Sequence, residues 1–145
     1  MDIKIPELTN KNNKEIAKQL AKVLIADKGI DVSLFNVTDT TVITDYYIIA
    51  TGRSSTHIKS LADDLADKSS EAKYPPTHIE GRDGGEWILL DYGNIIVHIF
   101  GKDSRAFYNL ERLCSEKIDI SDVEAELDRE LSQPQKTTTD DSANI

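Results

Sequence analysis

Three histidines and one cysteine are the side chains of this chain that most often bind metal or act as nucleophiles: His57, His78, His98 and Cys114. Structural zinc sites place ligand pairs a few residues apart, and no pair among these four has that short spacing. Nothing near His98 in the sequence completes a catalytic set, which favours a histidine hydrogen-bonded within a sheet. His57, at a helix start, is expected on the surface. The sequence therefore predicts no catalytic residue, no metal site and no cofactor.

A phosphate-binding turn is the alternative that the residues leave open. The turn Gly52-Ser54 lies between a predicted strand and a predicted helix, where a helix N-terminus can hold a nucleotide phosphate. A nucleotidyltransferase-like enzyme would also need carboxylates placed to hold magnesium. The nearest acidic pair, Asp63-Asp64, falls in the middle of the helix instead. Such an enzyme is therefore the second hypothesis for function.

The element that would position these groups is a hairpin between Glu86 and Lys102. Two runs rich in Ile, Val, Trp and Phe flank a Gly-Asn turn, which is typical of a β-hairpin. Because side chains alternate along a strand, the runs divide into two faces. One face is entirely apolar and belongs against helices or strands: Ile88, Leu90, Ile95, Val97 and Ile99. The other adds an acid and an imidazole to apolar residues: Trp87, Leu89, Asp91, Ile96, His98 and Phe100. A dry core would have to satisfy those polar groups, so we expect function on this second face.

Composition favours a soluble globular protein of the cytoplasm. Of the 145 residues, 39% are hydrophobic and 30% are charged. No apolar run approaches the roughly 18 residues that a membrane span needs, and the first residues resemble neither a signal nor a transit peptide. The net charge is −9, and residues 116–145 alone hold nine acids and three bases. Because no basic patch is visible, direct nucleic-acid binding is disfavoured, and a basic protein is the better-matched partner.

The predicted elements follow the order α-β-β-α-β-β-β-α. Their approximate ranges are a helix at 13–28 capped by Asn13, strands at 31–38 and 45–51, a helix capped by Ser54 or Ser55, a short strand at 77–80, the hairpin, and a helix at 104–114. This order predicts an α/β fold, a single domain with a mixed sheet of about five strands flanked by helices. We assign this domain to residues 1–115.

Residues 116–145 form an acidic extension, with a helix at about 121–131 followed by a disordered tail. The apolar stripe of that helix favours packing within the chain over recognition of a partner. In the preceding helix, one stripe is expected to point inward: Phe107, Leu110, Leu113 and Cys114. Another side repeats every three residues, so that an arginine and a glutamate could bracket a tyrosine: Arg105, Tyr108 and Glu111.

Several of these stretches together resemble the ribosomal silencing factor family, also called Iojap-like proteins. They are TDYYIIATG at 44–52, SSTH at 54–57, EG at 80–81, WILLDYG at 87–93, VHIF at 97–100, and Arg105 with Tyr108, Leu110 and Glu111. The resemblance runs in consistent order from about residue 14 to residue 114. Two features depart from the family's usual pattern: Cys114 stands where a tryptophan is usual, and the acidic extension begins at Glu116.

The resemblance implies a non-enzymatic repressor of translation that acts when nutrients are short. Such proteins bind the large ribosomal subunit through its fourteenth protein, a small β-barrel, and sterically block joining of the small subunit. The interface so implied is Trp87, Asp91 and Tyr92, with Leu89 and His98 beside them. The supporting residues so implied are Asp45, Arg105, Tyr108 and Glu111.

Three questions stay open at the level of the sequence. Trp87 could fill the core instead of binding a partner, since tryptophan is highly buried on average. A homodimer formed through the same sheet face would compete with ribosome binding. A minor contact with ribosomal RNA could come from Arg53, Lys59 or Arg105.

Overall fold

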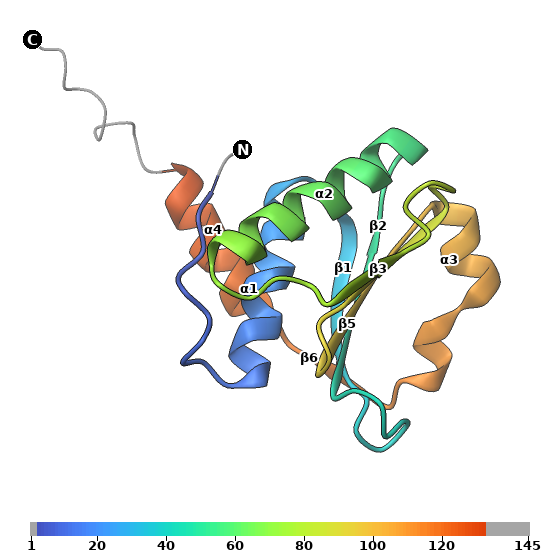
Figure 1. Ribbon diagram of the computed structural model, residues 1–145, viewed down its shortest axis with the longest axis horizontal. Helices are drawn as coiled ribbons and strands as arrows, with labels where there is room; N and C mark the ends of the chain where they lie inside the picture. Colours follow the sequence, from blue (N-terminus) through green and yellow to red (C-terminus); the bar gives the residue numbers. More distant parts are fainter. Residues whose placement is uncertain (1–2, 133–145) are drawn as a thin grey trace, which may run out of the picture.

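The structure, a computed structural model, describes residues 3–132. Its elements in chain order are α1 (Asn13–Ala26), β1 (Ile30–Asn36), β2 (Tyr46–Thr51), α2 (Ser55–Glu71), β3 (His78–Glu80), β4 (Trp87–Asp91), β5 (Ile95–Phe100), α3 (Lys102–Tyr108), the 3-10 helix η1 (Leu110–Leu113), β6 (Glu116–Ile118) and α4 (Ser121–Ser132). Helices α1 and α2 lie on one side of the sheet and α3 lies on the other (Figure 1). The predicted α/β fold with helices flanking a mixed sheet is confirmed.

One sheet of six strands, in the order β3-β4-β5-β2-β1-β6, organises the fold. β2 and β5 are parallel, whereas the other neighbouring pairs are antiparallel. The hairpin of β4 and β5 pairs Asp91 with Ile96 and Trp87 with Phe100. The sequence predicted about five strands, and the additional one is β6. Its three residues are too short to show an alternating pattern.

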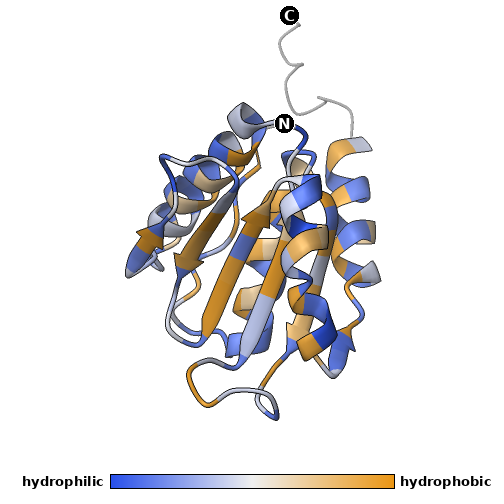
Figure 2. Ribbon diagram, turned by 90° about the vertical axis from the view of Figure 1, so that its right-hand side faces the viewer, coloured by the Kyte–Doolittle hydropathy of each residue, from blue (hydrophilic) through white to orange (hydrophobic). Residues whose placement is uncertain are grey.

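Two apolar clusters lie on the two faces of the sheet. The larger one joins α1, α2 and α4 to the sheet and includes the face of the hairpin predicted to be buried: Ile88, Leu90, Ile95, Val97 and Ile99. The smaller one lies under α3 and η1 and is formed by Phe35, Val37, Ile49 and Phe100. The central strands are accordingly largely apolar, while the helices carry both hydrophilic and hydrophobic residues (Figure 2).

Side chains of the predicted type cap both long helices. The cap of α1 is Asn12, one residue before the predicted Asn13, and its side-chain oxygen accepts from the Glu15 N–H at 2.9 Å. The cap of α2 is Ser54, whose Oγ accepts from the His57 N–H at 3.1 Å. The α2 cap fixes where β2 ends and the helix starts.

The helix predicted at 104–114 is broken, and part of its predicted inward stripe is wrong. Asn109 adopts a left-handed backbone (φ 44°), which ends α3 before η1 begins. The break rotates the later residues relative to a continuous helix. Phe107 is 80% exposed and Leu113 is 48% exposed, although both were expected to point inward. Leu110 and Cys114 do pack against the smaller apolar cluster.

Helix α4 packs against α1 and so belongs to the same core. Val123 and Leu127 are buried in the larger cluster. Two α1 lysines pair with α4 carboxylates: Lys18 with Asp122 at 3.0 Å and Lys22 with Glu130 at 2.7 Å. This confirms packing within the chain for the described part of the extension. The tail predicted to be disordered lies outside the described residues. No helix within residues 3–132 is both long and apolar enough to cross a membrane.

Candidate functional site

Strand β4 presents a half-exposed face on the side of the sheet that carries α3. Trp87, Leu89 and Asp91 occupy alternate positions and are partly exposed, whereas the intervening Ile88 and Leu90 are fully buried. The period of two is that of a strand with one face in the core and one face outward. The three residues predicted on β4 as partner contacts therefore share one accessible surface.

An aromatic cluster, formed by Tyr47, Trp87, His98, Phe100 and Tyr108, underlies this surface. The ring of Trp87 lies 4.9 Å from that of Phe100 and 4.6 Å from that of Tyr108, between centroids. Tyr47 meets His98 edge-on at 4.7 Å. Such ring contacts stabilise the position of each ring in addition to the stabilisation that comes from buried apolar area. Trp87 is thus neither fully buried nor free to move.

His98 lies buried at the bottom of the aromatic cluster. Only 4% of the residue is exposed, and its Nδ1 accepts a hydrogen bond from Trp87 Nε1–H at 3.1 Å. Because Nδ1 is the acceptor, the ring proton of neutral His98 is on Nε2. Burial lowers the pKa of His98 to about 4, so the ring is neutral at pH 7. His98 orients the indole of Trp87 and does not itself reach the surface.

Asp91 and Tyr92, which follow each other in sequence, lie in different environments. Asp91 Oδ1 accepts the Gly93 N–H at 2.7 Å, an interaction that shapes the turn where Gly93 has φ +91°. Tyr92 is 6% exposed, and its hydroxyl contacts Ser69 Oγ on α2 at 2.8 Å. Its ring stacks on Tyr74 at 5.4 Å, and burial raises its pKa. The phenol of Tyr92 is therefore out of reach of a partner on the β4 surface.

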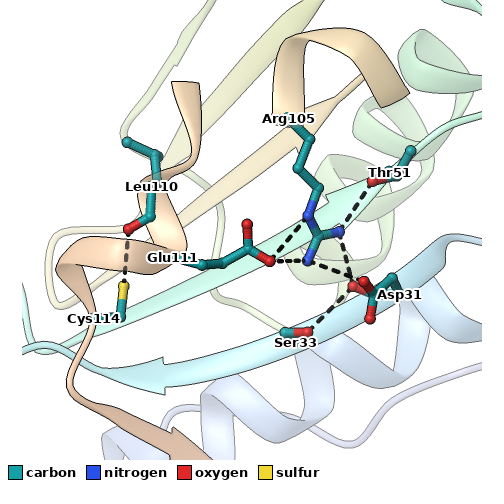
Figure 3. Close-up of polar contacts among 7 residues, drawn as sticks. All are labelled: Asp31, Ser33, Thr51, Arg105, Leu110, Glu111 and Cys114. Atoms are coloured by element: carbon teal, nitrogen blue, oxygen red, sulfur yellow. Dashed lines mark hydrogen bonds and ion pairs between the residues drawn. The ribbon is translucent and has the colours of Figure 1, made fainter. Parts of the chain in front are cut away.

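Arg105 is the centre of a second group of polar residues, at the carboxyl end of β2 (Figure 3). Its guanidinium donates to Glu111 Oε2 at 2.7 and 3.2 Å, to the Asp31 carbonyl at 2.9 Å and to Thr51 Oγ1 at 3.0 Å. A bulge in β1 and the positive φ of Asp31 (52°) accompany this contact with the Asp31 carbonyl. The network ties α3 and η1 to the sheet.

The predicted supporting residues do not form one group. Tyr108 contacts Trp87, while Arg105 pairs directly with Glu111, so the expected bracket of arginine and glutamate around the tyrosine is wrong. The helix break at Asn109 explains the difference. Asp45 lies at the other end of β2, where its carboxylate accepts from the side chain of Asn13 at 3.4 Å.

Exposed apolar side chains on α3 and in the loop before β2 are features that sequence reasoning missed. Phe107 packs edge-on against Tyr108 at 5.0 Å. In the loop before β2, Val42 and Ile43 are 101% and 69% exposed. Thr40 Oγ1 of this loop donates to the Leu113 carbonyl at 3.0 Å, which brings the loop beside η1. Only Asn109, a residue that tolerates left-handed backbone, signals in sequence that the helix ends early.

The remaining histidines have structural partners. His57 is 8% exposed, so its predicted surface position is wrong; Nδ1 accepts from the Arg53 N–H at 2.9 Å, and Nε2 lies 3.0 Å from the Asp27 carbonyl. The ring thereby links the start of α2 to the end of α1. His78 contacts Glu80 at 2.8 Å on the surface. Across residues 3–132, no group of three or more His, Cys, Asp or Glu side chains is placed to hold a metal ion.

Known proteins share both the sequence and the architecture. A protein of Zymomonas mobilis named Ribosomal silencing factor RsfS is 37% identical over 98 residues, which are 68% of this chain and 74% of that protein. A Bacillus subtilis protein of the same name is 31% identical over 102 residues, 70% of this chain and 86% of its own length. A crystal structure of a Chromobacterium violaceum protein matches with a TM-score of 0.69 and 32% identity, over 71% of this chain and 86% of that one.

A family model described as "Ribosomal silencing factor during starvation" matches residues 10–144. The match extends past residue 114, where the resemblance seen in the sequence ended, and takes in β6 and α4. Sequence, fold and family model agree with the resemblance seen in the sequence. The chain belongs to the ribosomal silencing factor family.

Proposed function

We propose that this protein is a non-enzymatic repressor of translation that binds the large ribosomal subunit and blocks joining of the small subunit. Its family and its relatives are described as ribosomal silencing factors. The observation that carries the proposal is the β4 surface, where Trp87 stands partly exposed beside Leu89 and Asp91. An aromatic residue held by its neighbours and open on one side is the usual anchor of a protein interface.

The partner that suits this surface is a basic protein of the large subunit, and we propose its fourteenth protein. Trp87 would supply contact area, and it has few rotatable bonds to immobilise on binding. One oxygen of Asp91 is occupied by the Gly93 N–H, and the other is available for a lysine or arginine of the partner. The protein's net charge of −9 favours encounter with a basic surface.

His98 and Tyr108 act in this proposal as positioning residues. His98 holds the indole through the Trp87 Nε1–H bond, and Tyr108 packs against the same ring from α3. Tyr92 supports the turn from within the core. A bound protein at this surface would exclude the small subunit by its volume, so the mechanism requires no chemical step. In the acidic pair of α2, Asp63 pairs with Arg82 and Asp64 pairs with Lys68, away from the turn at Gly52.

Sedimentation with separated ribosomal subunits tests the proposal. The protein is expected to migrate with large subunits and not with small ones, and joined ribosomes should decrease as the protein is added. Trp87→Ala should weaken binding by roughly 30-fold or more, because loss of an interface anchor costs about 2 kcal/mol or more. Binding of Trp87→Ala at the strength of the parent would exclude the β4 surface.

Tyr74→Ala is the matched control. Tyr74 is a partly buried aromatic residue that packs on the core face of the sheet, against Tyr92. Its truncation should lower stability while leaving subunit binding intact. A second copy of this chain is the competing occupant of the β4 surface. If Trp87→Ala abolishes self-association in analytical ultracentrifugation but leaves subunit binding intact, the surface serves dimerisation instead.

A further inference from the structure

A crevice lies at the carboxyl ends of β2 and β5, the parallel pair of the sheet. After β2 the chain enters α2 on one side of the sheet, and after β5 it enters α3 on the other side (Figure 1). In open α/β sheets, ligands bind where the connections of adjacent parallel strands diverge in this way. The proposed ribosome contact reaches this end of the sheet through Trp87, which pairs with Phe100 on β5, but none of its residues lines the crevice.

Glycine holds the two strand ends together at this point. The Gly52 N–H donates to the Phe100 carbonyl at 2.9 Å, across the gap between β2 and β5. A Cβ at position 52 would lie 2.6 Å from Ile58 Cγ1 and 3.0 Å from the Ile58 nitrogen, so a side chain there would push α2 away. The crevice therefore depends on a residue without a side chain.

Beside Gly52 the crevice opens into a cavity of about 820 Å³. Small-molecule sites commonly have volumes of roughly 300–1,000 Å³. The cavity lies between the bulged start of β1 and helix α3, and Arg105 with its network forms part of its lining. Ile30 and Ala106 line it as well, and Ile30 is 45% exposed. An isoleucine left open to water in a concave site is a surface that an apolar or aromatic ring would cover.

Two cations at this cavity have no acidic partner. Arg105 is paired with Glu111, but Arg53 and Lys102, which also line the cavity, form no ion pair with any residue in the described range 3–132. Helix α2, which starts just after Arg53, has no acidic residue in its first turn, so its positive end is not neutralised there. Arginine and lysine beside such a helix end are the groups that bind phosphate.

Acidic neighbours limit how many phosphates the site would accept. A smaller pocket of about 500 Å³ adjoins the cavity and shares Gly52, Arg53 and Lys102 with it. Glu86 and Asp103 line that pocket. Additional phosphates extending in that direction would meet these carboxylates, which repel them.

We propose that this cavity binds a small phosphorylated molecule of nucleoside-monophosphate class, with its phosphate between Arg53 and Lys102 and its ring system against Ile30 and Ala106. Asp31 and Glu111, the two carboxylates that line the cavity itself, pair with Arg105, and a monophosphate matches the two cations that remain, Arg53 and Lys102, and the apolar wall. A triphosphate is disfavoured by the acidic pocket. The site is separate from the β4 surface, so ligand binding and ribosome binding can be tested independently.

Isothermal titration calorimetry of the full chain with AMP and with GMP tests the inference. We expect saturable binding at one site, tighter than about 1 mM. Arg53→Ala and Lys102→Ala should each weaken it by roughly tenfold, the loss expected for one charged hydrogen bond. ATP, adenosine and inorganic phosphate should each bind more weakly than AMP. Ala106→Trp, a change at an exposed position, should abolish binding by filling the cavity.

Two control variants separate the site from general charge and from the ribosome contact. Arg82→Ala removes a basic residue outside the cavity and should leave AMP binding unchanged, as should Trp87→Ala. Binding that is equally tight for inorganic phosphate, or that survives both Arg53→Ala and Lys102→Ala, would overturn the inference. So would the absence of heat with both nucleotides, or binding of a short single-stranded RNA in the absence of mononucleotide binding.

Discussion

Arg105→Met is expected to be among the most destabilising single changes in α3, because Arg105 is the residue of this helix that is buried against the sheet. Arg105 is 8% exposed, and its guanidinium donates to groups from β1, β2 and η1, so its removal leaves several acceptors without a partner at once. The most costly of these is the carboxylate of Glu111, whose side chain is only 32% exposed. A methionine has about the length and apolar character of the aliphatic stem of arginine, but it restores none of the hydrogen bonds.

The expected loss is about 3 kcal/mol of unfolding free energy. Breaking one partner of a buried ion pair costs roughly 3–5 kcal/mol, and the partial exposure of Glu111 places this case at the low end. The chain offers a matched comparison in Arg82, whose guanidinium bonds Asp63 at 2.7 and 2.9 Å with side chains 45% and 52% exposed. Arg82→Met should cost less than about 1 kcal/mol, because exposed pairs contribute little.

Urea unfolding of both variants, followed by circular dichroism, measures the two costs. A double-mutant cycle with Glu111→Gln should give a coupling of about 1–2 kcal/mol between Arg105 and Glu111. The midpoint temperature of thermal unfolding (Tm) should be roughly 10 °C lower in Arg105→Met than in the parent. If Arg105→Met loses no more stability than Arg82→Met, burial does not strengthen the network, and the reasoning is refuted.

Three further predictions follow from the buried polar groups. Burial lowers the pKa of His98 to about 4, so the stability linked to the neutral ring is complete above pH 6.5 and is lost as pH falls toward 4, by up to about 1.4 kcal/mol per pH unit. Desolvation and a hydrogen bond that protonated Asp27 donates to the Asp64 carboxylate raise the pKa of Asp27 to about 7, and this group changes stability with the opposite sign. The test therefore compares urea unfolding of the parent and of His98→Gln at pH 7.5 and pH 5, and an equal change of stability with pH in both proteins would refute the prediction. Tyr92→Phe should lower the unfolding free energy by about 1 kcal/mol, because the hydrogen bond with Ser69 is lost, and it should leave large-subunit binding unchanged in sedimentation. Weakened binding would show that the phenol reaches the partner. Lys22→Ala should lower the unfolding free energy by about 2 kcal/mol and speed amide hydrogen exchange throughout α4, since this buried ammonium pairs with two α4 carboxylates. Unchanged exchange would show that apolar packing alone holds the helix.

The hairpin could be predicted because its pattern is local. Alternation along the strand from Trp87 to Asp91 assigned each side chain to the correct face, because a shift of the register by one residue would exchange the faces. Pairing of Asp91 with Asn94 and pairing of Tyr92 with Ile95 give the same faces, so the pattern alone left the register itself open. The caps of α1 and α2 were predicted to within a residue for the same reason, since a cap depends on its own turn.

The Arg105 network could not be predicted, because its partners come from residues 31, 51 and 111. They meet only after a bulge in β1 and a left-handed residue between α3 and η1 have redirected the chain. Sequence spacing suggested that Arg105, Tyr108 and Glu111 share a helix face. The fold instead separates Tyr108 from the ion pair, since a single αL residue changes the direction of everything after it.

The contact between α1 and α4 has a consequence for the order in which the newly made protein can fold. Lys18 and Lys22 find their carboxylates 104 and 108 residues later in the chain, and the outer edge of β1 is covered only when β6 has been made. At roughly 5–20 residues per second, synthesis leaves the first helix without these partners for on the order of 5–20 s. During that time β1 has an unpaired edge, which is prone to pairing with other chains. A chain interrupted before Glu116 would keep that edge open, so premature termination should produce aggregation-prone fragments instead of a smaller working domain.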